Sequence, residues 1–240
     1  MKTATQISLL LATFLLTACR EDPVPETQAG IEPILLSPSE GERWVYKVEV
    51  SLDPTAQIPS GVIDAGPEGS ETTYQKERRY LGLKPLKANS DEQAHCFEIS
   101  KDRRVQELEF SLIDERGIST RAWQEAGKER ILMEAVLLVP TSEVPGSVWS
   151  MSLPDPNDPG GAPMFYRQFQ YYGLEEILVM GQSQKAHRIK VFGKTGPVEL
   201  QRDFWFVNQL GFVKERKSYY SEKTRLALIE EVLIEHYLPE

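Results

Sequence analysis

The chain has 240 residues, with 36 acidic residues (Asp and Glu) against 27 basic ones (Lys and Arg) and a formal net charge of −9. This acidic balance, without a long basic run, excludes a surface that tracks nucleic-acid phosphates and argues against electrostatic binding to anionic lipid headgroups. The length is enough for one large all-β domain or two small domains.

The N-terminal segment is typical of an export signal. Lys2 supplies a positive start, and an apolar run over residues 7–16 follows it. A run of about ten residues is too short to span the ~30 Å hydrocarbon core of a bilayer. The segment is therefore expected to be cleaved rather than to cross a membrane.

The residues around the expected cleavage site, Leu16, Thr17, Ala18 and Cys19, resemble the lipobox of bacterial lipoproteins. The resemblance implies that residues 1–18 are a lipoprotein signal peptide and that Cys19 is lipidated. Two or three acyl chains would anchor the protein stably in a membrane, because each buried methylene contributes ~0.8 kcal/mol. The alternative is an ordinary signal peptide with a cysteine at its cleavage site.

An acylated Cys19 has two consequences. Cys96 then has no partner within the chain, so the domain contains no disulfide and depends on its hydrophobic core. Arg20 follows the cysteine, and in the proteobacterial sorting scheme an Asp at that position favours the inner membrane. The resemblance therefore implies an exported protein, lipid-anchored to the outer membrane and facing the periplasm.

Residues 19–40, which begin with the lipidated cysteine, form the predicted tether. Prolines fall among Glu, Ser, Thr and Gly at Pro23, Pro25, Pro33 and Pro38. Such a stretch cannot bury a core, so it is expected to be flexible. A single antiparallel β domain is predicted over residues 41–240.

The domain alternates apolar and polar residues with a period of two rather than 3.6, beginning at Trp44, Tyr46 and Val48. Residues 131–139 are mostly apolar, which predicts a strand buried on both faces. The expected strands cover residues 44–52, 72–83, 95–100, 107–112, 118–124, 131–139, 166–172, 174–180, 186–192, 198–207 and 212–220.

The last segment, residues 224–238, fits either a helix or a strand. A strand is favoured because the segment follows a turn-like stretch after an alternating run. About ten strands with hardly any helix predict an all-β or mainly β fold, a large curved antiparallel sheet or open half-barrel.

Three sequence blocks resemble a group of bacterial envelope lipoproteins: GERWVY at 41–46, PGSVW at 145–149 and DFWFVNQLGFVK at 203–214. Those proteins are similar to the carriers and receptors of the lipoprotein-localisation (Lol) system, of the LolA and LolB type. The resemblance implies a curved antiparallel half-barrel that binds lipid. The Pro-Ala-Gly-Thr-Phe turn of that family is reduced to Gly181 here, so a shared ligand does not follow.

No residue pattern in the chain predicts catalysis, a metal site or a cofactor. His95, His187 and His236 are scattered without ligand spacing. His95 and Cys96 are neighbours on a strand, so their side chains point to opposite faces and cannot act as a base and nucleophile.

Two further motifs fail on spacing. Residues 181–185 begin like a nucleophile elbow, but Lys185 stands where the second glycine belongs. Asp155, Asn157 and Asp158 lie in a Pro/Gly-rich loop, yet the twelfth position of an EF-hand loop would be Tyr166 rather than Glu.

The aromatic content is the one pattern that suggests a binding site. Tyr166, Phe169, Tyr171 and Tyr172 run together in one expected strand, and Trp205 belongs to another. Aromatics on both faces exceed what a one-faced core needs, so the surplus lines a concave apolar cavity or faces a covering loop. These five residues are the candidate ligand-lining side chains.

The sequence thus favours a non-enzymatic lipoprotein, attached to a membrane by its N-terminal acyl chains. One function left open is the binding of lipid or another apolar ligand on the concave face of the sheet. The alternative is a structural or assembly factor of the envelope that acts through another envelope protein. Nucleic acid is not an expected partner.

Overall fold

The computed structural model describes residues 36–55, 72–87, 91–125, 127–153, 165–195 and 198–239. These residues belong to the compact unit Pro33–Glu240, and the other unit, Met1–Glu32, lies outside them. The predicted signal peptide, Cys19 and most of the predicted tether are therefore outside the described residues. The domain boundaries drawn from the sequence stay predictions.

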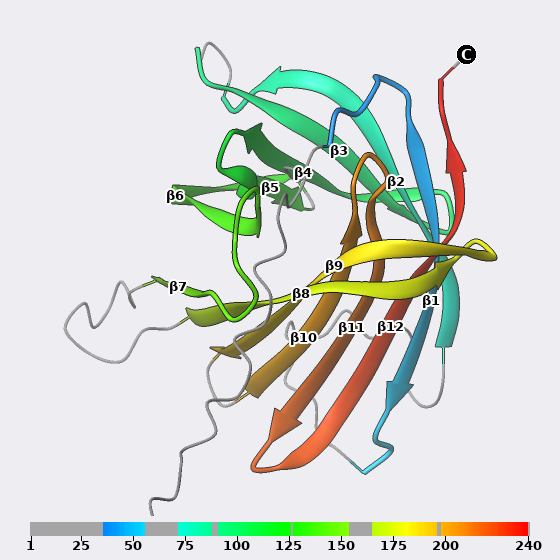
Figure 1. The fold of residues 1–240 in the computed structure, drawn as a ribbon, viewed down its shortest axis with the longest axis vertical. Coiled ribbons are helices and arrows are strands. Elements are labelled where there is room, and N and C mark those ends of the chain that lie inside the picture. The colour runs from blue at the N-terminus through cyan, green and yellow to red at the C-terminus, as the bar shows by residue number, and fades with distance from the viewer. Residues whose placement is uncertain are drawn as a thin grey trace, which may run out of the picture. The chain divides into compact units, whose positions relative to one another are not determined.

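All regular elements among the described residues are strands, and they form one antiparallel sheet of twelve strands (Figure 1). In chain order they are β1 (Arg43–Leu52), β2 (Thr72–Pro85), β3 (Gln93–Lys101), β4 (Arg104–Asp114), β5 (Gly117–Glu125), β6 (Lys128–Pro140), β7 (Val148–Leu153), β8 (Phe165–Val179), β9 (Gln182–Thr195), β10 (Val198–Val207), β11 (Gly211–Ser221) and β12 (Thr224–Tyr237). The all-β fold predicted from the period-two pattern is confirmed.

The strand order is β6-β5-β4-β3-β2-β1-β12-β11-β10-β9-β8-β7, so β6 and β7 are the two edges and the sheet is open. Residues of the ambiguous C-terminal segment form β12, which pairs with β1 on one side and with β11 on the other. The strand interpretation of that segment is confirmed. No helix in the described part of the chain is long and apolar enough to cross a membrane.

Strand β8 corrects the prediction of two strands over 166–172 and 174–180. It runs through Gly173, where the pairing with β9 shifts register after Tyr171. The φ of Gly173 is +100°, a conformation that favours glycine. The residue therefore makes a bulge that bends one strand instead of a turn that ends it.

Strand β7 was not predicted from the sequence. It has only six residues and lies between two stretches rich in proline and glycine, so its alternation is short. It pairs along β8, with Trp149 opposite Phe169.

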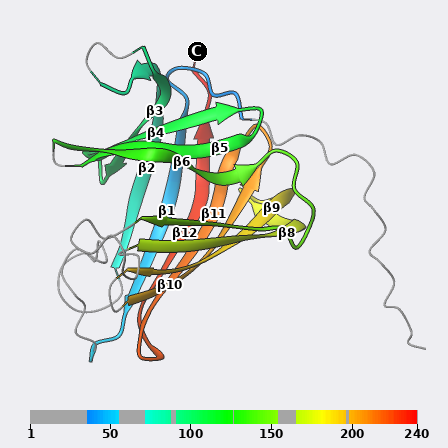
Figure 2. The same ribbon diagram turned by 90° about the vertical axis from the view of Figure 1, so that its left-hand side faces the viewer.

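Both ends of the sheet curl toward the same side. In Figure 2, β4–β6 from one end and β7 with β8 from the other cross in front of β1, β11 and β12. The edge strands come together there, because Trp149 Nε1 in β7 donates a hydrogen bond to the backbone oxygen of Leu137 in β6 at 2.8 Å. The sheet thus encloses a concave face without backbone pairing between β6 and β7.

Two large buried clusters form most of the hydrophobic core. The first contains Trp44, Tyr46 and Val48 together with Trp205, as the alternating pattern predicted, while Phe206 belongs to the second. The second cluster joins the curled ends, because it combines residues of β5 and β6 with residues of β8, β9 and β10.

A third cluster contains Cys96, which is buried and forms no disulfide among the described residues. Ile131 of β6 packs against this cluster, while its neighbour Leu132 belongs to the second one. Strand β6 therefore has apolar contacts on both faces, as predicted from its sequence.

The packed chain begins before β1. Leu36 is 4% exposed and belongs to the second cluster, and Ser39 donates its backbone N–H to Glu42 Oε2 at 2.8 Å. The last residues of the predicted tether thus lie against the sheet.

Candidate ligand-binding cavity

A cavity of about 280 Å³ lies on the concave side of the sheet. Its floor comes from the central strands β1, β2, β10, β11 and β12, and its roof from β4, β5 and β6. The curl that brings the end of the sheet over its centre therefore creates the cavity.

The floor carries a continuous network of ion pairs. Lys217 Nζ lies 3.1 Å from Glu215 Oε1 and 3.2 Å from Glu231 Oε1, and Lys76 Nζ lies 2.5 Å from Glu231 Oε2. Arg202 pairs with Glu215 at the other end. The network joins β2, β12, β11 and β10.

The strand register explains this convergence. Arg202 is directly opposite Lys217, and Glu215 is directly opposite Glu231. Like charges that face each other across a sheet are unfavourable, so the stabilising contacts are the diagonal ones between opposite charges. Side chains of both signs are thus drawn together over the floor.

The network keeps two of its members, Lys217 and Glu231, charged inside the sheet. Burial alone would lower the pKa of Lys217, but Glu215 and Glu231 more than offset this and leave that pKa above its ordinary value. Burial alone would raise the pKa of Glu231, and Lys217 and Lys76 reverse the effect, so that pKa falls well below its ordinary value.

Arg78 is the most deeply buried cation of the cavity, with 6% of its surface exposed. Its guanidinium lies 3.7 Å above the ring of Phe97, and its Nη2 donates to Glu109 Oε1 at 3.2 Å. Its Nε has no hydrogen-bond partner in the described structure. A buried N–H of this kind ordinarily has a partner, so one donor of the lining is left unsatisfied.

Glu107 on the roof differs from the other carboxylates of the cavity. It forms no ion pair within the described ranges, whereas Glu109, Glu215 and Glu231 all do. Burial, with a contribution from the charge of Glu109, raises the pKa of Glu107 to about 7. The group is therefore partly protonated near neutral pH.

Apart from Thr120 and Lys214, the remaining lining is apolar and aromatic. Trp123 and Leu138 come from the roof, and Ile99 and Phe212 complete the wall. Tyr46 is fixed by a hydrogen bond from its hydroxyl to the backbone oxygen of Phe212 at 2.9 Å. A charged floor thus faces an apolar wall across a small space.

The five predicted ligand-lining residues do not come together around this cavity. Phe169 and Tyr171 are buried in the second cluster, and Trp205 is buried in the first. Tyr166 and Tyr172 are 36% and 45% exposed. The ligand-lining role of these residues stays a prediction.

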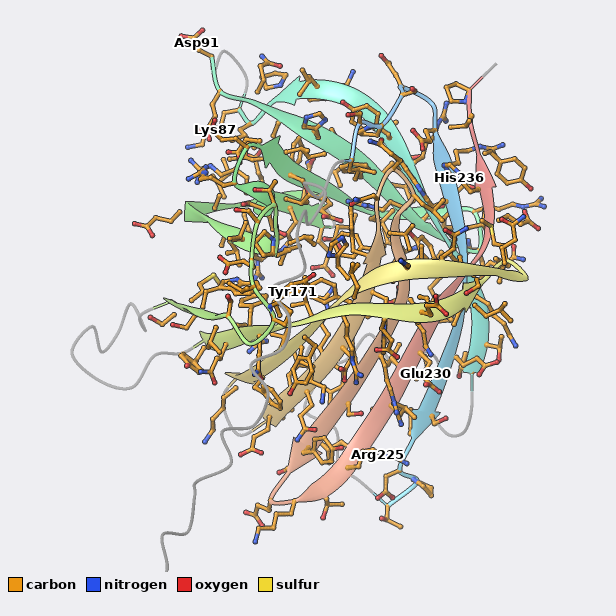
Figure 3. The ribbon with its side chains drawn as sticks, in the orientation of Figure 1. Lys87, Asp91, Tyr171, Arg225, Glu230 and His236 are labelled. Carbon is orange, nitrogen blue, oxygen red and sulfur yellow. The ribbon has the colours of Figure 1, made fainter. Side chains whose placement is uncertain are left out.

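Tyr171, labelled in Figure 3, has a local partner for its polar end. Its hydroxyl lies 2.8 Å from Nδ1 of His187, and burial raises the pKa of Tyr171 and lowers that of His187. Such a pair satisfies both buried groups without a ligand.

The other two histidines also have individual partners. Tyr80 Oη lies 2.8 Å from His95 Nδ1, and His236 Nε2 lies 2.7 Å from Glu42 Oε1. Among the residues that the structure describes, no group of three or more His, Cys, Asp or Glu side chains could hold a metal ion.

The other motifs considered in the sequence are the acidic loop, the elbow-like segment at Gly181 and Cys96. Asp155, Asn157 and Asp158 lie outside the described residues. Gly181 is in the turn between β8 and β9, with φ +80°. Burial raises the pKa of Cys96 to about 11, which keeps its thiol protonated at neutral pH.

The charged cavity was missed in the sequence because polar residues occupy both faces of the strands that form it. In β2, Lys76 and Arg78 point to the cavity, while Gln75, Glu77 and Arg79 alternate with them. The alternating pattern alone therefore gave no reason to place any of these charges inside.

The fold and cavity define an open, curved antiparallel sheet with a charged concave interior. No family model matches the chain, and no curated protein matches it.

Three solved structures resemble the fold. A protein assigned as exported, with a YMCC-like fold, from Bacteroides fragilis has 10% identity and a TM-score of 0.39, over 86% of this chain and 100% of that one. A protein assigned as a lipoprotein from Parabacteroides distasonis has 11% identity and a TM-score of 0.36, over 85% and 99%.

The third is a LolA superfamily protein from Nitrosomonas europaea, with 9% identity and a TM-score of 0.24, over 85% of this chain and 89% of that one. Likenesses this distant carry no conclusion about function.

Proposed function

We propose that the chain is an exported envelope protein, anchored through acyl chains on Cys19, that has no catalytic role and binds a lipid or another apolar ligand inside its curved sheet. The observation that supports a binding role is the 280 Å³ cavity on the concave side. Concave sites with apolar walls and a few convergent polar groups are the usual form of ligand sites in proteins.

The size of the cavity limits what it can hold. With ~30 Å³ for each non-hydrogen atom, the share of one molecule in liquid water, 280 Å³ has room for roughly nine such atoms. A short amphiphile or the end of a longer lipid fits this space, with its apolar part against Trp123, Leu138, Ile99 and Phe212.

The test measures binding of 1-hexanol, a small apolar probe, to the wild type and to a variant in which a larger side chain fills the cavity. The full chain is held in phosphatidylcholine nanodiscs, and binding is followed by ligand-observed NMR with empty nanodiscs subtracted. Wild-type protein is expected to bind hexanol saturably. Ile99→Trp is expected to abolish this binding, because Ile99 lines the cavity and the larger ring occupies it.

Val144→Trp is the matched control, because it adds the same ring to a side chain that is 63% exposed. It should bind hexanol like the wild type. Equal binding by wild type and Ile99→Trp would contradict a site inside the sheet, provided that circular dichroism shows the variant to be folded.

A further inference from the structure

We propose that the ligand of this cavity carries one anionic group, a carboxylate or a phosphate, on a short apolar body, and that the anion lies on the floor cations opposite Glu107. This inference rests on the proposed function, because it names the chemistry of the ligand for the same cavity. It is carried by the distribution of charge over the lining and by an unsatisfied donor there.

The floor has more positive than negative side chains. Five cations, Lys76, Arg78, Arg202, Lys214 and Lys217, stand against two carboxylates, Glu215 and Glu231, an excess of three positive charges. Glu109 from the roof neutralises one of them by pairing with Arg78. Two positive charges remain, and an ionised Glu107 would neutralise one of them, so an anionic group on the ligand, a carboxylate or a phosphate, balances the lining.

These cations have both the reach and the free capacity to bind an anion. Lys76, Arg202 and Lys217 keep 24%, 25% and 23% of their side chains accessible. The buried Nε of Arg78 is a donor without an acceptor. An anionic oxygen is the acceptor that a buried guanidinium binds most strongly.

Glu107 is the group that an anion would meet on the roof. The charged groups around it are Glu109 on its own strand, Glu125 on β5, Lys76 and Arg78 on β2, Arg202 on β10, Lys214, Glu215 and Lys217 on β11, and Glu231 on β12. An ionised Glu107 would repel the anion, whereas its protonated form would donate a hydrogen bond to it. Binding is therefore coupled to uptake of a proton by Glu107.

The apolar wall supplies the second part of the specificity. The rings of Trp123 and Phe212, with Ile99 and Leu138, lie beside the charged floor in the same lining. A free inorganic anion would leave this wall without contacts. Hexanoate, with eight non-hydrogen atoms, fits the roughly nine that the volume allows, whereas hexyl phosphate has eleven.

The experiment compares four compounds that share a hexyl-length chain but differ in the charge of their head group, together with inorganic phosphate, which has no chain. Hexanoate, hexyl phosphate, 1-hexanol, hexylammonium and inorganic phosphate are titrated at pH 6.0 against the full chain in phosphatidylcholine nanodiscs, by the same NMR method. At least one of the two hexyl anions is expected to bind about tenfold more tightly than hexanol, the effect of one charge-assisted hydrogen bond. The stronger of the two identifies the head group.

The proton is tested with Glu107→Gln, which keeps the shape and can donate a hydrogen bond. At pH 8.0 only about one in eleven Glu107 side chains is protonated if its pKa is about 7, so the variant should bind the hexyl anion about tenfold more tightly than wild type. At pH 6.0 the two should agree. Glu98→Gln, on β3 outside this cavity, should match wild type at both values.

Each contrary result has a distinct meaning. Hexanol binding as tightly as both hexyl anions, or hexylammonium binding more tightly than either, overturns the anionic ligand and leaves the proposed binding function standing. Inorganic phosphate binding as tightly as hexyl phosphate overturns the apolar body. Equal affinity of wild type and Glu107→Gln at pH 8.0 overturns the role of Glu107. No binding of any hexyl compound contradicts the proposed function itself.

Discussion

The charged residues inside the sheet need an explanation at the level of single side chains. Replacing a buried ion pair by apolar residues is often neutral or stabilising, so such a network is weak evidence for a purely structural role. Removing one partner is different, because the remaining charge stays buried without compensation. Glu231 is such a partner, since it accepts hydrogen bonds from both Lys76 and Lys217.

We expect Glu231→Gln to lower the free energy of unfolding by about 3 kcal/mol at pH 7, the lower end for a broken buried pair. The lower end applies because Lys76 and Lys217 keep about a quarter of their side chains exposed, 24% and 23%. Urea unfolding measures the loss. Glu230→Gln is the control, because Glu230, labelled in Figure 3, has a side chain that is 39% exposed and should change stability by less than about 1 kcal/mol.

The free energy of unfolding should depend on pH differently in the wild type and in Glu231→Gln. The pKa of Glu231 is lower in the folded protein than its ordinary value of 4.5. Its contribution to stability is therefore fully present above about pH 5 and is lost as pH falls toward the folded pKa. Wild type should lose stability more steeply than Glu231→Gln below pH 5, and parallel curves would contradict the assignment.

Cys19 carries the prediction about the anchor. The thiol is the only group at the predicted cleavage site that can take a diacylglycerol, so Cys19→Ser should abolish lipidation and leave uncleaved precursor in the membrane fraction. Incorporation of labelled palmitate and partitioning into detergent measure the effect. Undiminished labelling of the variant would contradict a lipoprotein.

At the level of elements, the strands were largely predictable because one face of most of them is apolar. In β1, Val48 and Val50 are buried while Lys47 and Glu49 are exposed, which is the pattern that an alternating sequence indicates. The bulge at Gly173 was not predictable, because glycine is equally typical of a turn that ends a strand and of a bulge that bends it. The difference lies in the backbone partners, which the local sequence does not contain.

The cavity could not be predicted by the same reasoning. Lys76 and Glu231 are separated by 155 positions and meet only because β1 and β12 pair between them. Glu107 and Trp123 reach the floor only because β4–β6 curl over it. A sequence pattern of two-residue period reports which residues share a face of one strand, but not which faces a curved sheet brings together.

At the level of the whole sheet, the strand order has one exceptional pairing. Each strand pairs with its neighbour in the chain from β1 to β6 and from β7 to β12. Strands β1 and β12 also pair with each other, although nearly the whole domain separates them in the sequence. The sheet is thus two sequential meanders joined at the centre by the first and last strands. Neither meander can lose its central strand without exposing the backbone and the core of the other.

We therefore expect the full chain to unfold in urea as one cooperative unit. Tryptophan fluorescence and far-UV circular dichroism should give coincident transitions, because Trp44 lies in β1, Trp123 in one meander, and Trp149 and Trp205 in the other. Val48→Ala should move both transitions together by roughly 2 kcal/mol, because Val48 is 0% exposed at the central pairing. Val105→Ala should change stability by less than about 0.5 kcal/mol, because Val105 is 57% exposed. Two separate transitions, or a Val48→Ala effect on one probe alone, would mean that the meanders fold independently and that the β1–β12 pairing does not unite the sheet.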